Sequence, residues 1–377
     1  MKTITDKYII REMNEKLVLK TIIDEGAVSR AEIAKILNLN KTSVSSIVGD
    51  LLTRDLIIEL GAGKSSGGRK PTILTFNAKA GYSLSFDVGP NNITSILTYL
   101  NGDFVADKYT NTDNLAAEHI LDNLKADIEI YLNKLKNSTY GIVGICIGIH
   151  GIVNNNKVIF SPFYSFDEID LKAELEATFK IPVLLENEAN LAALGEQKHT
   201  TSASNLVSIS VKHGVGAGTI LNGKLYTGTD GHAGEIGHLI TVINGHQCPC
   251  GNQGCLELYA SEYNILKGYQ AALNLESISF TRFKKDYYAN TLEAKKWMTY
   301  FAWYMAIAVN NLITTFNPEV IIINSRFTNQ IAGIVEQIKA ELHYKGQGEV
   351  VIKYSTLDRE ATLLGGSHLN CAQFLGF

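Results

Sequence analysis

The chain has 377 residues, of which 45% are hydrophobic, 19% are charged and only 6 are proline. This length exceeds what one hydrophobic core organises, so we expect two or three domains, and the composition excludes a largely disordered chain. The formal net charge of −4 argues against a wholly basic nucleic-acid-binding protein but allows a locally basic segment. Neither a signal-peptide core nor a membrane-spanning apolar run occurs, which predicts a cytoplasmic protein with reduced thiols and no membrane partner.

The first 77 residues carry the pattern of three short helices. Apolar residues recur at helical spacing from Ile9 to Ile23, and Gly26 ends this first helix. Ser29 and Glu32 form a capping box for the second helix, and a short turn leads to a third helix from about Lys41 to Arg54. Such a pair, with small polar residues at the exposed N-terminal end of its second helix, is typical of a helix-turn-helix that enters the major groove. The side chains that we expect to face DNA are Lys41, Thr42, Ser43, Ser45 and Ser46.

A basic hairpin follows the third helix. Its expected strands run from Ile57 to Leu60 and from Thr72 to Phe76, with a tip of glycine, serine, lysine and arginine between them. Arg69 and Lys70 lie in this tip, where a narrow A·T-rich minor groove can receive them. The pattern predicts a winged helix-turn-helix domain over residues 1–77 with operator DNA as its partner. The alternative is a generic three-helix bundle with a basic, flexible hairpin.

Strands and helices alternate from about Ala78 onward, which predicts an α/β fold. A tight turn at Asp87 and Gly89 precedes a helix from about Ala116 to Lys136. A continuous apolar strand, GIVGICIGIHGIV, then has the character of a strand buried on both faces. His150 at its end either points into a cleft or, as is more frequent, lies in the core or at the surface.

The next strand delivers two polar residues to its carboxyl end. It runs from Val183 to Glu186 and is followed by Asn187 and Glu188, and a helix begins near Ala189. Open α/β sheets bind ligands at this end of their strands. A later glycine-rich run, Gly214 to Gly218, is a weaker signal that also fits an ordinary β-turn.

The stretch from His232 to Glu257 holds three of the five cysteines. Thiolates and an imidazole at this density suit a closed tetrahedral Zn²⁺ site, and Gly251 and Gly254 allow the backbone to wrap closely around a metal. His246 competes for the fourth position, but its separation from the first cysteine makes a very small loop. The alternative is a set of buried free thiols or a disulfide. The predicted ligands of a structural zinc ion are His238, Cys248, Cys250 and Cys255.

The sequence HAGEIGH followed by CxCGxxGCLE resembles the signature of the ROK family, which contains repressors and sugar kinases. The helix-turn-helix and the GRKP run resemble those of the family's repressors, particularly the xylose-repressor type, so the resemblance covers essentially the whole chain. It implies that a two-lobed domain of the actin-like ATPase and sugar kinase type follows the winged helix. It also implies a zinc-braced sugar pocket, although Glu235 and Glu257 could instead be solvated surface charges. The sugar-binding residues that it implies are Asn187, Glu188, Glu235, His238 and Glu257.

Several positions depart from the pattern of the family's kinases. The phosphate loop DxGGTK is here disrupted, because Pro90, Asn91 and Asn92 follow Gly89 and proline removes a backbone donor. Glu188 occupies the position of the aspartate that acts as general base. Its extra methylene displaces the carboxylate by about an ångström, which can cost about 10²-fold in rate. The remaining replacements lie in the second glycine-rich loop, at Lys212 and His213, and beneath the adenine, at Asn324 and Ser325.

These features together predict a repressor of carbohydrate-utilisation genes without kinase activity. The expected effector is a monosaccharide of the xylose or glucose class, and the expected assembly is a homodimer or a dimer of dimers. The sensor domain should span residues 78–377, with lobe one over about 78–186 plus the C-terminal helix at about 360–377, and lobe two over about 187–359. Two alternatives remain, an active ROK sugar kinase with an accessory DNA-binding domain and a regulator that senses zinc itself.

Overall fold

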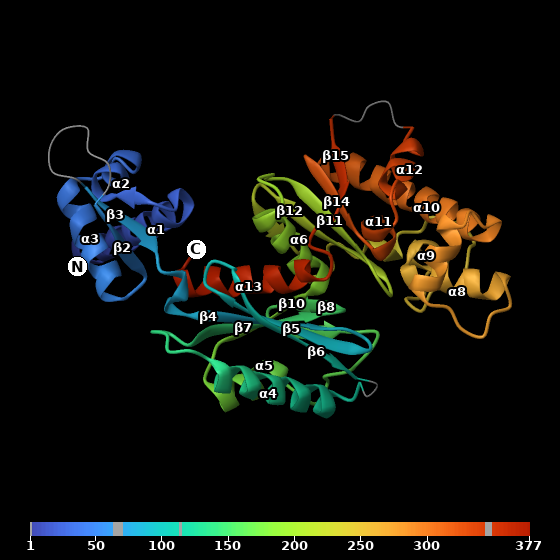
Figure 1. Ribbon diagram of the computed structural model, residues 1–377, viewed down its shortest axis with the longest axis horizontal. Coiled ribbons are helices and arrows are strands. Elements are labelled where there is room, and N and C mark those ends of the chain that lie inside the picture. The colour runs from blue at the N-terminus through green and yellow to red at the C-terminus, as the bar shows by residue number, and fades with distance from the viewer. Residues whose placement is uncertain (1, 63–70, 113–114, 344–348) are drawn as a thin grey trace.

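The computed structural model describes residues 2–62, 71–112, 115–343 and 349–377. A small N-terminal part lies at one end of the molecule, and two α/β lobes form the rest, with helices α6 and α13 between their sheets (Figure 1). No helix within the described ranges is both long enough and apolar enough to cross a lipid bilayer.

The N-terminal part contains three helices and a small antiparallel sheet of order β1-β3-β2. Its elements are α1 (Lys2–Glu25), β1 (Val28–Ser29), α2 (Arg30–Ile36), α3 (Lys41–Thr53), β2 (Ile57–Ala62) and β3 (Thr72–Phe76). The predicted capping box starts α2, because the backbone N–H of Glu32 donates to Ser29 Oγ and the backbone N–H of Ser29 donates to Glu32 Oε2. Asn40 caps α3 by accepting from the backbone N–H of Ser43 at 2.7 Å. A helix-turn-helix followed by a hairpin therefore forms where the sequence predicted it.

The first lobe is built on a mixed sheet of order β10-β7-β4-β5-β6. Its strands are β4 (Tyr82–Val88), β5 (Asn92–Tyr99), β6 (Phe104–Asn111), β7 (Ile142–Ile149) and β10 (Val183–Asn187), and a short ribbon adds β8 (Ile152–Asn154) and β9 (Lys157–Phe160). Strands β4, β7 and β10 are parallel, so their carboxyl ends lie at one edge. Helices α4 (Ala117–Lys134) and α5 (Leu171–Phe179) cover one face, and α13 (Glu360–Leu375) packs on the other (Figure 1).

The second lobe has a five-stranded sheet of order β13-β12-β11-β14-β15. Its strands are β11 (Leu206–Val211), β12 (Val215–Leu221), β13 (Lys224–Tyr226), β14 (Val320–Asn324) and β15 (Val351–Tyr354). Helix α6 (Glu188–His199) packs on β11 and β12. The remaining helices are α7 (Glu257–Ala260), α8 (Glu262–Ala272), α9 (Phe280–Tyr288), α10 (Leu292–Phe316), α11 (Arg326–Gln330) and α12 (Ile334–Ala340). The largest hydrophobic core joins α8, α9, α10 and α12 to the strands of this sheet.

Glycines bring α6 and α13 into direct backbone contact between the two sheets. A Cβ atom on Gly365 would lie 1.8 Å from the carbonyl oxygen of Leu191, and one on Gly195 would lie 2.1 Å from the carbonyl oxygen of Ala361. No side chain fits at either position, because Cβ atoms essentially never approach other heavy atoms within 3.0 Å. The two helices therefore form a tightly crossed pair that belongs to both lobes.

The far end of α13 reaches the N-terminal part. Phe374 and Leu375 pack against the core that α1, α2 and α3 share. Tyr140 stands at the same junction, since its ring meets Phe374 edge-on at 4.9 Å and its hydroxyl donates to the carbonyl oxygen of Arg54 at 2.6 Å. One continuous helix thus connects the interlobe region to the helix-turn-helix.

Candidate functional site

The structure gathers the four predicted metal ligands. His238 ends a short 3₁₀ helix (Ile236–His238), and the three cysteines lie on the loop that leads into α7. The ligand atoms of His238, Cys248, Cys250 and Cys255 all lie within 4.8 Å of one another. One histidine nitrogen and three thiol sulfurs are a soft donor set that matches a closed tetrahedral zinc site. These residues can therefore hold a metal ion.

The competing histidine lies outside this cluster. The ring of His246 stacks on Tyr259, with the ring centroids 5.3 Å apart. Gly254 explains the tight loop, since its φ of +83° suits glycine and a Cβ atom there would lie 1.7 Å from the carbonyl oxygen of Val242. The place of His238 in the cluster and the stacking of His246 on Tyr259 therefore favour His238 as the fourth ligand.

Two predicted sugar-binding carboxylates flank the ring of His238. Glu257 Oε1 lies 3.6 Å from its Nδ1, the nitrogen that also faces the thiol of Cys248. Glu235 Oε2 lies 3.9 Å from Nε2 on the opposite side of the ring. Burial raises the pKa of Glu235, and nearby Glu257 and Glu188 reinforce that rise against the opposing effect of His238 and His232. Glu257 and Glu188, the other two predicted sugar-binding carboxylates, thus both lie within electrostatic range of Glu235.

Asn187 has a structural task at the start of α6. Its Oδ1 accepts from the backbone N–H groups of Ala189 at 2.8 Å and Asn190 at 3.1 Å. Its Nδ2 donates to the carbonyl oxygen of Gly151 at 2.7 Å. The amide therefore caps the helix that carries Glu188 and ties it to the end of β7.

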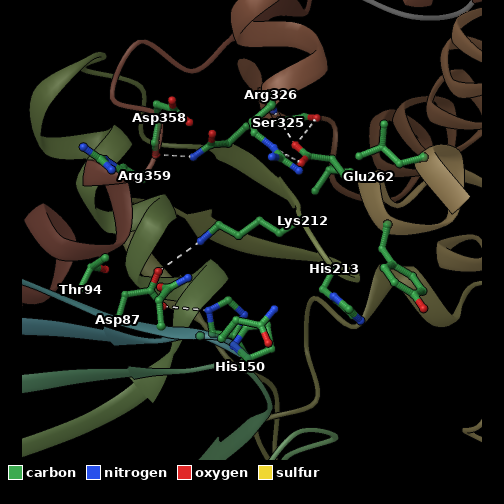
Figure 2. Close-up of a pocket in the computed structure, with 18 of the residues that line it drawn as sticks. Asp87, Thr94, His150, Lys212, His213, Glu262, Ser325, Arg326, Asp358 and Arg359 are labelled. Carbon is green, nitrogen blue, oxygen red and sulfur yellow. Dashed lines mark hydrogen bonds and ion pairs between the residues drawn. The ribbon is translucent and has the colours of Figure 1, made fainter. Parts of the chain in front are cut away.

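Glu188 belongs to a buried charged cluster that sequence reasoning missed. Its carboxylate accepts from Ser210 Oγ at 3.0 Å, and Lys212 Nζ lies 3.3 Å from both Glu188 Oε2 and Asp87 Oδ2. His150 Nε2 lies 2.8 Å from Asp87 Oδ1 (Figure 2), and its Nδ1 lies 3.9 Å from Glu188 Oε1. His150 thus faces the cleft, which is the less frequent of the two positions considered for it.

Neighbouring charges favour the ionised forms of Asp87 and Lys212. Burial disfavours the ionised carboxylate of Asp87, but Lys212 and His150 outweigh burial and hold the pKa of Asp87 well below its usual range. Burial likewise disfavours the ammonium of Lys212, yet Asp87 and Glu188 raise its pKa above the ordinary value. The signal available in the sequence was positional: Asp87, Glu188 and Lys212 all lie at or just beyond the end of a buried strand.

A cavity of about 870 Å³ opens beside this cluster, between the two lobes. Its walls include Asp87, His150 and Lys212, as Figure 2 shows. The positions that depart from the kinase pattern also line it, namely Pro90, Asn91, Asn92, Lys212, His213, Asn324 and Ser325. The five predicted sugar-binding residues are not among its described lining residues.

Internal hydrogen bonds link the start of α8 to the start of α11 in one wall of the cavity. The carboxylate of Glu262 accepts from Ser325 Oγ at 2.9 Å and from the backbone N–H and Nε of Arg326 at 2.6 Å each. Asn324 Nδ2 donates to the carbonyl oxygen of Asp358 at 2.7 Å. The hydroxyl of Ser325 and the backbone N–H and Nε of Arg326 are therefore engaged by a carboxylate of the chain itself.

The predicted DNA-facing residues lie on α3. Lys41, Thr42, Ser45 and Ser46 are exposed, and Ser43 is half-buried with its backbone N–H bound by Asn40. Arg11 of α1 reaches this surface, because it pairs with Asp50 at 2.5 Å and its Nη2 lies 3.4 Å from Ser46 Oγ. Arg69 and Lys70 lie outside the described residues.

Comparison with known proteins agrees with this arrangement along the whole chain. The xylose repressor of Bacillus spizizenii is 35% identical over 99% of this chain and 98% of its own length. The xylose repressor of Staphylococcus xylosus is 33% identical over 96% of this chain and 95% of its own length. Both alignments include the helix-turn-helix.

Solved structures show the same fold. A ROK family transcriptional regulator, described as a homologue of the E. coli MLC protein, has a TM-score of 0.81 and 26% identity, covering 97% of each chain. A ROK family glucokinase from Streptomyces griseus, solved with glucose and AMPPNP, has a TM-score of 0.69 at 23% identity and covers 77% of this chain and 99% of its own. These matches confirm the predicted fold class, and the ROK family model matches residues 83–372. The chain belongs to the ROK family.

Proposed function

We propose that this protein is a sugar-responsive transcriptional repressor with a monosaccharide of the xylose class as effector. The main support for this proposal is that xylose repressors and a ROK transcriptional regulator are similar to this protein along the whole chain, including the helix-turn-helix. The match to the glucokinase, by contrast, covers 77% of this chain and 99% of the glucokinase chain. The additional segment here has the exposed polar helix surface that major-groove contact requires.

DNA binding is assigned to the winged helix over residues 1–77. The exposed hydroxyls of Thr42, Ser45 and Ser46 are small enough for α3 to approach bases and phosphates closely. Arg69 and Lys70 in the wing would add contacts to an anionic groove. A two-fold symmetric operator would then be read by a homodimer, whose half-site spacing must match the separation of the two α3 helices.

Sugar binding is assigned to Glu188, Glu235, His238 and Glu257, with Asn187 holding the helix that presents Glu188. Carboxylates accept hydrogen bonds from sugar hydroxyls, and each net bond is worth about 0.5–1.5 kcal/mol, or more when one partner is charged. The metal would be a structural zinc ion. A zinc ion on Nδ1 of His238 would fix the ring and leave Nε2 directed toward Glu235 and the sugar.

Absence of kinase activity is part of the proposal. Phosphoryl transfer requires a cradled nucleotide held in line with the accepting hydroxyl. Here Lys212 lies between Asp87 and Glu188, and Glu262 engages the donors at Ser325 and Arg326. These internal contacts at Lys212, Ser325 and Arg326 support the proposal that the cavity does not hold a nucleotide for transfer.

Helix α13 offers a direct route from the sugar site to DNA. At its first turn, Thr362 Oγ1 donates to the carbonyl oxygen of Glu188 at 3.4 Å, and at its end Phe374 packs on the winged-helix core. A change in lobe closure at α6 would therefore rotate the winged helices of a dimer. We propose that sugar relieves repression. Because coupling is reciprocal, operator DNA must weaken sugar binding by the same factor.

The test measures operator binding by fluorescence anisotropy during titration with xylose and with glucose. We expect xylose to weaken binding for the wild-type protein, and Glu257→Gln to abolish this response while keeping operator affinity. Glu336→Gln, an exposed carboxylate on α12, is the matched control and should respond as wild type does. A chain that binds no operator would refute the proposal, and sugar-dependent ATP consumption at about 1–100 per second would favour the kinase alternative.

A further inference from the structure

Lys212 joins the two lobes through charge. Asp87 lies on β4 in the first lobe, whereas Lys212 follows β11 in the second lobe, and the two side chains meet at 3.3 Å across the cleft (Figure 2). This ion pair therefore connects a strand in the sheet of the first lobe to the end of a strand in the sheet of the second. The same ammonium lies 3.3 Å from Glu188 at the head of α6.

The cluster needs a cation at this position. The side chains of Asp87 and Glu188 are each only 10% exposed, and both face the ammonium of Lys212. Two buried carboxylates directed at one point repel each other unless a positive charge lies between them. His150 contacts both carboxylates, but its nitrogens lie 2.8 Å from Asp87 and 3.9 Å from Glu188, so it serves Asp87 chiefly.

We propose that Lys212 is the bridge that allows the two lobes to close on a sugar alone, without a nucleotide in the cleft. The inference rests on the proposed function, because it takes Glu188 as a sugar contact. In the closed arrangement, Lys212 neutralises Asp87 and orients the carboxylate that the sugar meets. Opening of the lobes separates Lys212 from Asp87, so sugar binding and closure favour each other.

This role differs from that of an ordinary core ion pair. A purely structural lysine would change the stability of the protein without changing the dependence of its shape on sugar. A bridge makes sugar affinity and lobe closure depend on the same two groups, Lys212 and Asp87. Lys212 is therefore a positioning residue, and its effect must be coupled to that of Asp87.

The experiment compares wild type with Lys212→Met, Asp87→Asn and the double variant. Methionine keeps the length of the side chain and removes its charge. Asp87→Asn breaks the same pair from the other lobe with nearly unchanged shape, which keeps the test decisive if Lys212→Met does not fold. Lys267→Met is the control, because Lys267 lines the cavity and lies over the ring of Tyr263 rather than beside these carboxylates.

Two quantities are measured with xylose and with glucose: the dissociation constant by calorimetry, and the radius of gyration by small-angle scattering with and without saturating sugar. We expect Lys212→Met to weaken sugar binding about tenfold or more and to lose the sugar-induced contraction. Lys267→Met should keep both. The double variant should bind sugar no more weakly than the single variant with the lower sugar affinity, because both substitutions remove one shared interaction.

Several results would overturn the inference. Wild-type affinity and contraction in Lys212→Met would do so, as would strictly additive losses in the double variant. Tighter sugar binding by Lys212→Met would show that Lys212 competes with the sugar for Glu188. If the wild-type protein binds neither sugar, both the proposed function and this inference are refuted. If wild type binds and Lys212→Met behaves identically, the inference fails alone.

Discussion

The substitution Gly365→Ala should force α6 and α13 apart. The new methyl group would lie 1.8 Å from the carbonyl oxygen of Leu191 and 2.6 Å from its carbonyl carbon, whereas Cβ atoms essentially never come within 3.0 Å of other heavy atoms. The atoms in the way belong to a helix backbone, so no side-chain rotation relieves the clash. The helices must separate, and the contacts that both make with the two sheets must loosen.

The expected cost follows from this geometry. Overpacking of a core costs about 1–3 kcal/mol, and a clash with backbone places this variant near the upper end, at about 3 kcal/mol. Since 1 kcal/mol shifts the melting temperature of a domain of 150–250 residues by about 2–4 °C, we expect Gly365→Ala to melt roughly 6–12 °C below wild type.

Thermal unfolding followed by far-UV circular dichroism measures this difference. Gly49→Ala is the matched control, because it makes the same change within helix α3, where a Cβ atom meets nothing within 4 Å. That control should be neutral or stabilising by up to about 1 kcal/mol, since alanine is the better helix former. A Gly365→Ala protein with the wild-type melting temperature would show that the crossing has spare room and that our reasoning is wrong.

Further predictions concern the metal, the DNA surface and pH. Cys250→Ser should lower the zinc content, measured by elemental analysis, well below the level of about one ion per chain expected for wild type. It should also destabilise the sugar-binding domain. Normal folding and a normal sugar response in wild-type protein that contains no zinc would contradict the site. Replacing Arg69 and Lys70 by alanine should reduce the slope of log affinity against log salt by about 2. Ser45→Ala should instead change the preferred operator sequence. An unchanged slope or an unchanged sequence preference would argue against these contacts. Burial of His368, reinforced by nearby positive side chains, lowers its pKa from 6.5 to about 4, so the unfolded chain binds the extra proton first and the free energy of unfolding should fall as pH drops from 6.5 toward 4. His368→Asn should flatten that dependence in denaturant titrations, and an unaltered pH profile would rule out His368 as its source.

Local features of this protein were set by the amino-acid sequence alone. The capping box at Ser29 and Glu32 formed as predicted, because both partners lie within one helical turn. The helix-turn-helix, the hairpin strands and the buried strand β7 also arose where their hydrophobic periods indicated. The grouping of His238 with Cys248, Cys250 and Cys255 was equally accessible, since a short glycine-containing loop keeps these ligands close.

Tertiary packing decided how the cleft is lined. Lys212 is 125 residues from Asp87 in the chain, and Glu262 is 63 residues from Ser325, so neither pairing leaves a periodic or spacing signal. The task of Asn187 as a helix cap was also hidden, because the amide chemistry that suits a sugar equally suits backbone N–H groups. The need for glycine at position 365 arises only where α13 meets α6, since an isolated helix would accept alanine there more readily. Contacts between distant segments depend on the packing of whole lobes, and no local pattern of residues specifies them.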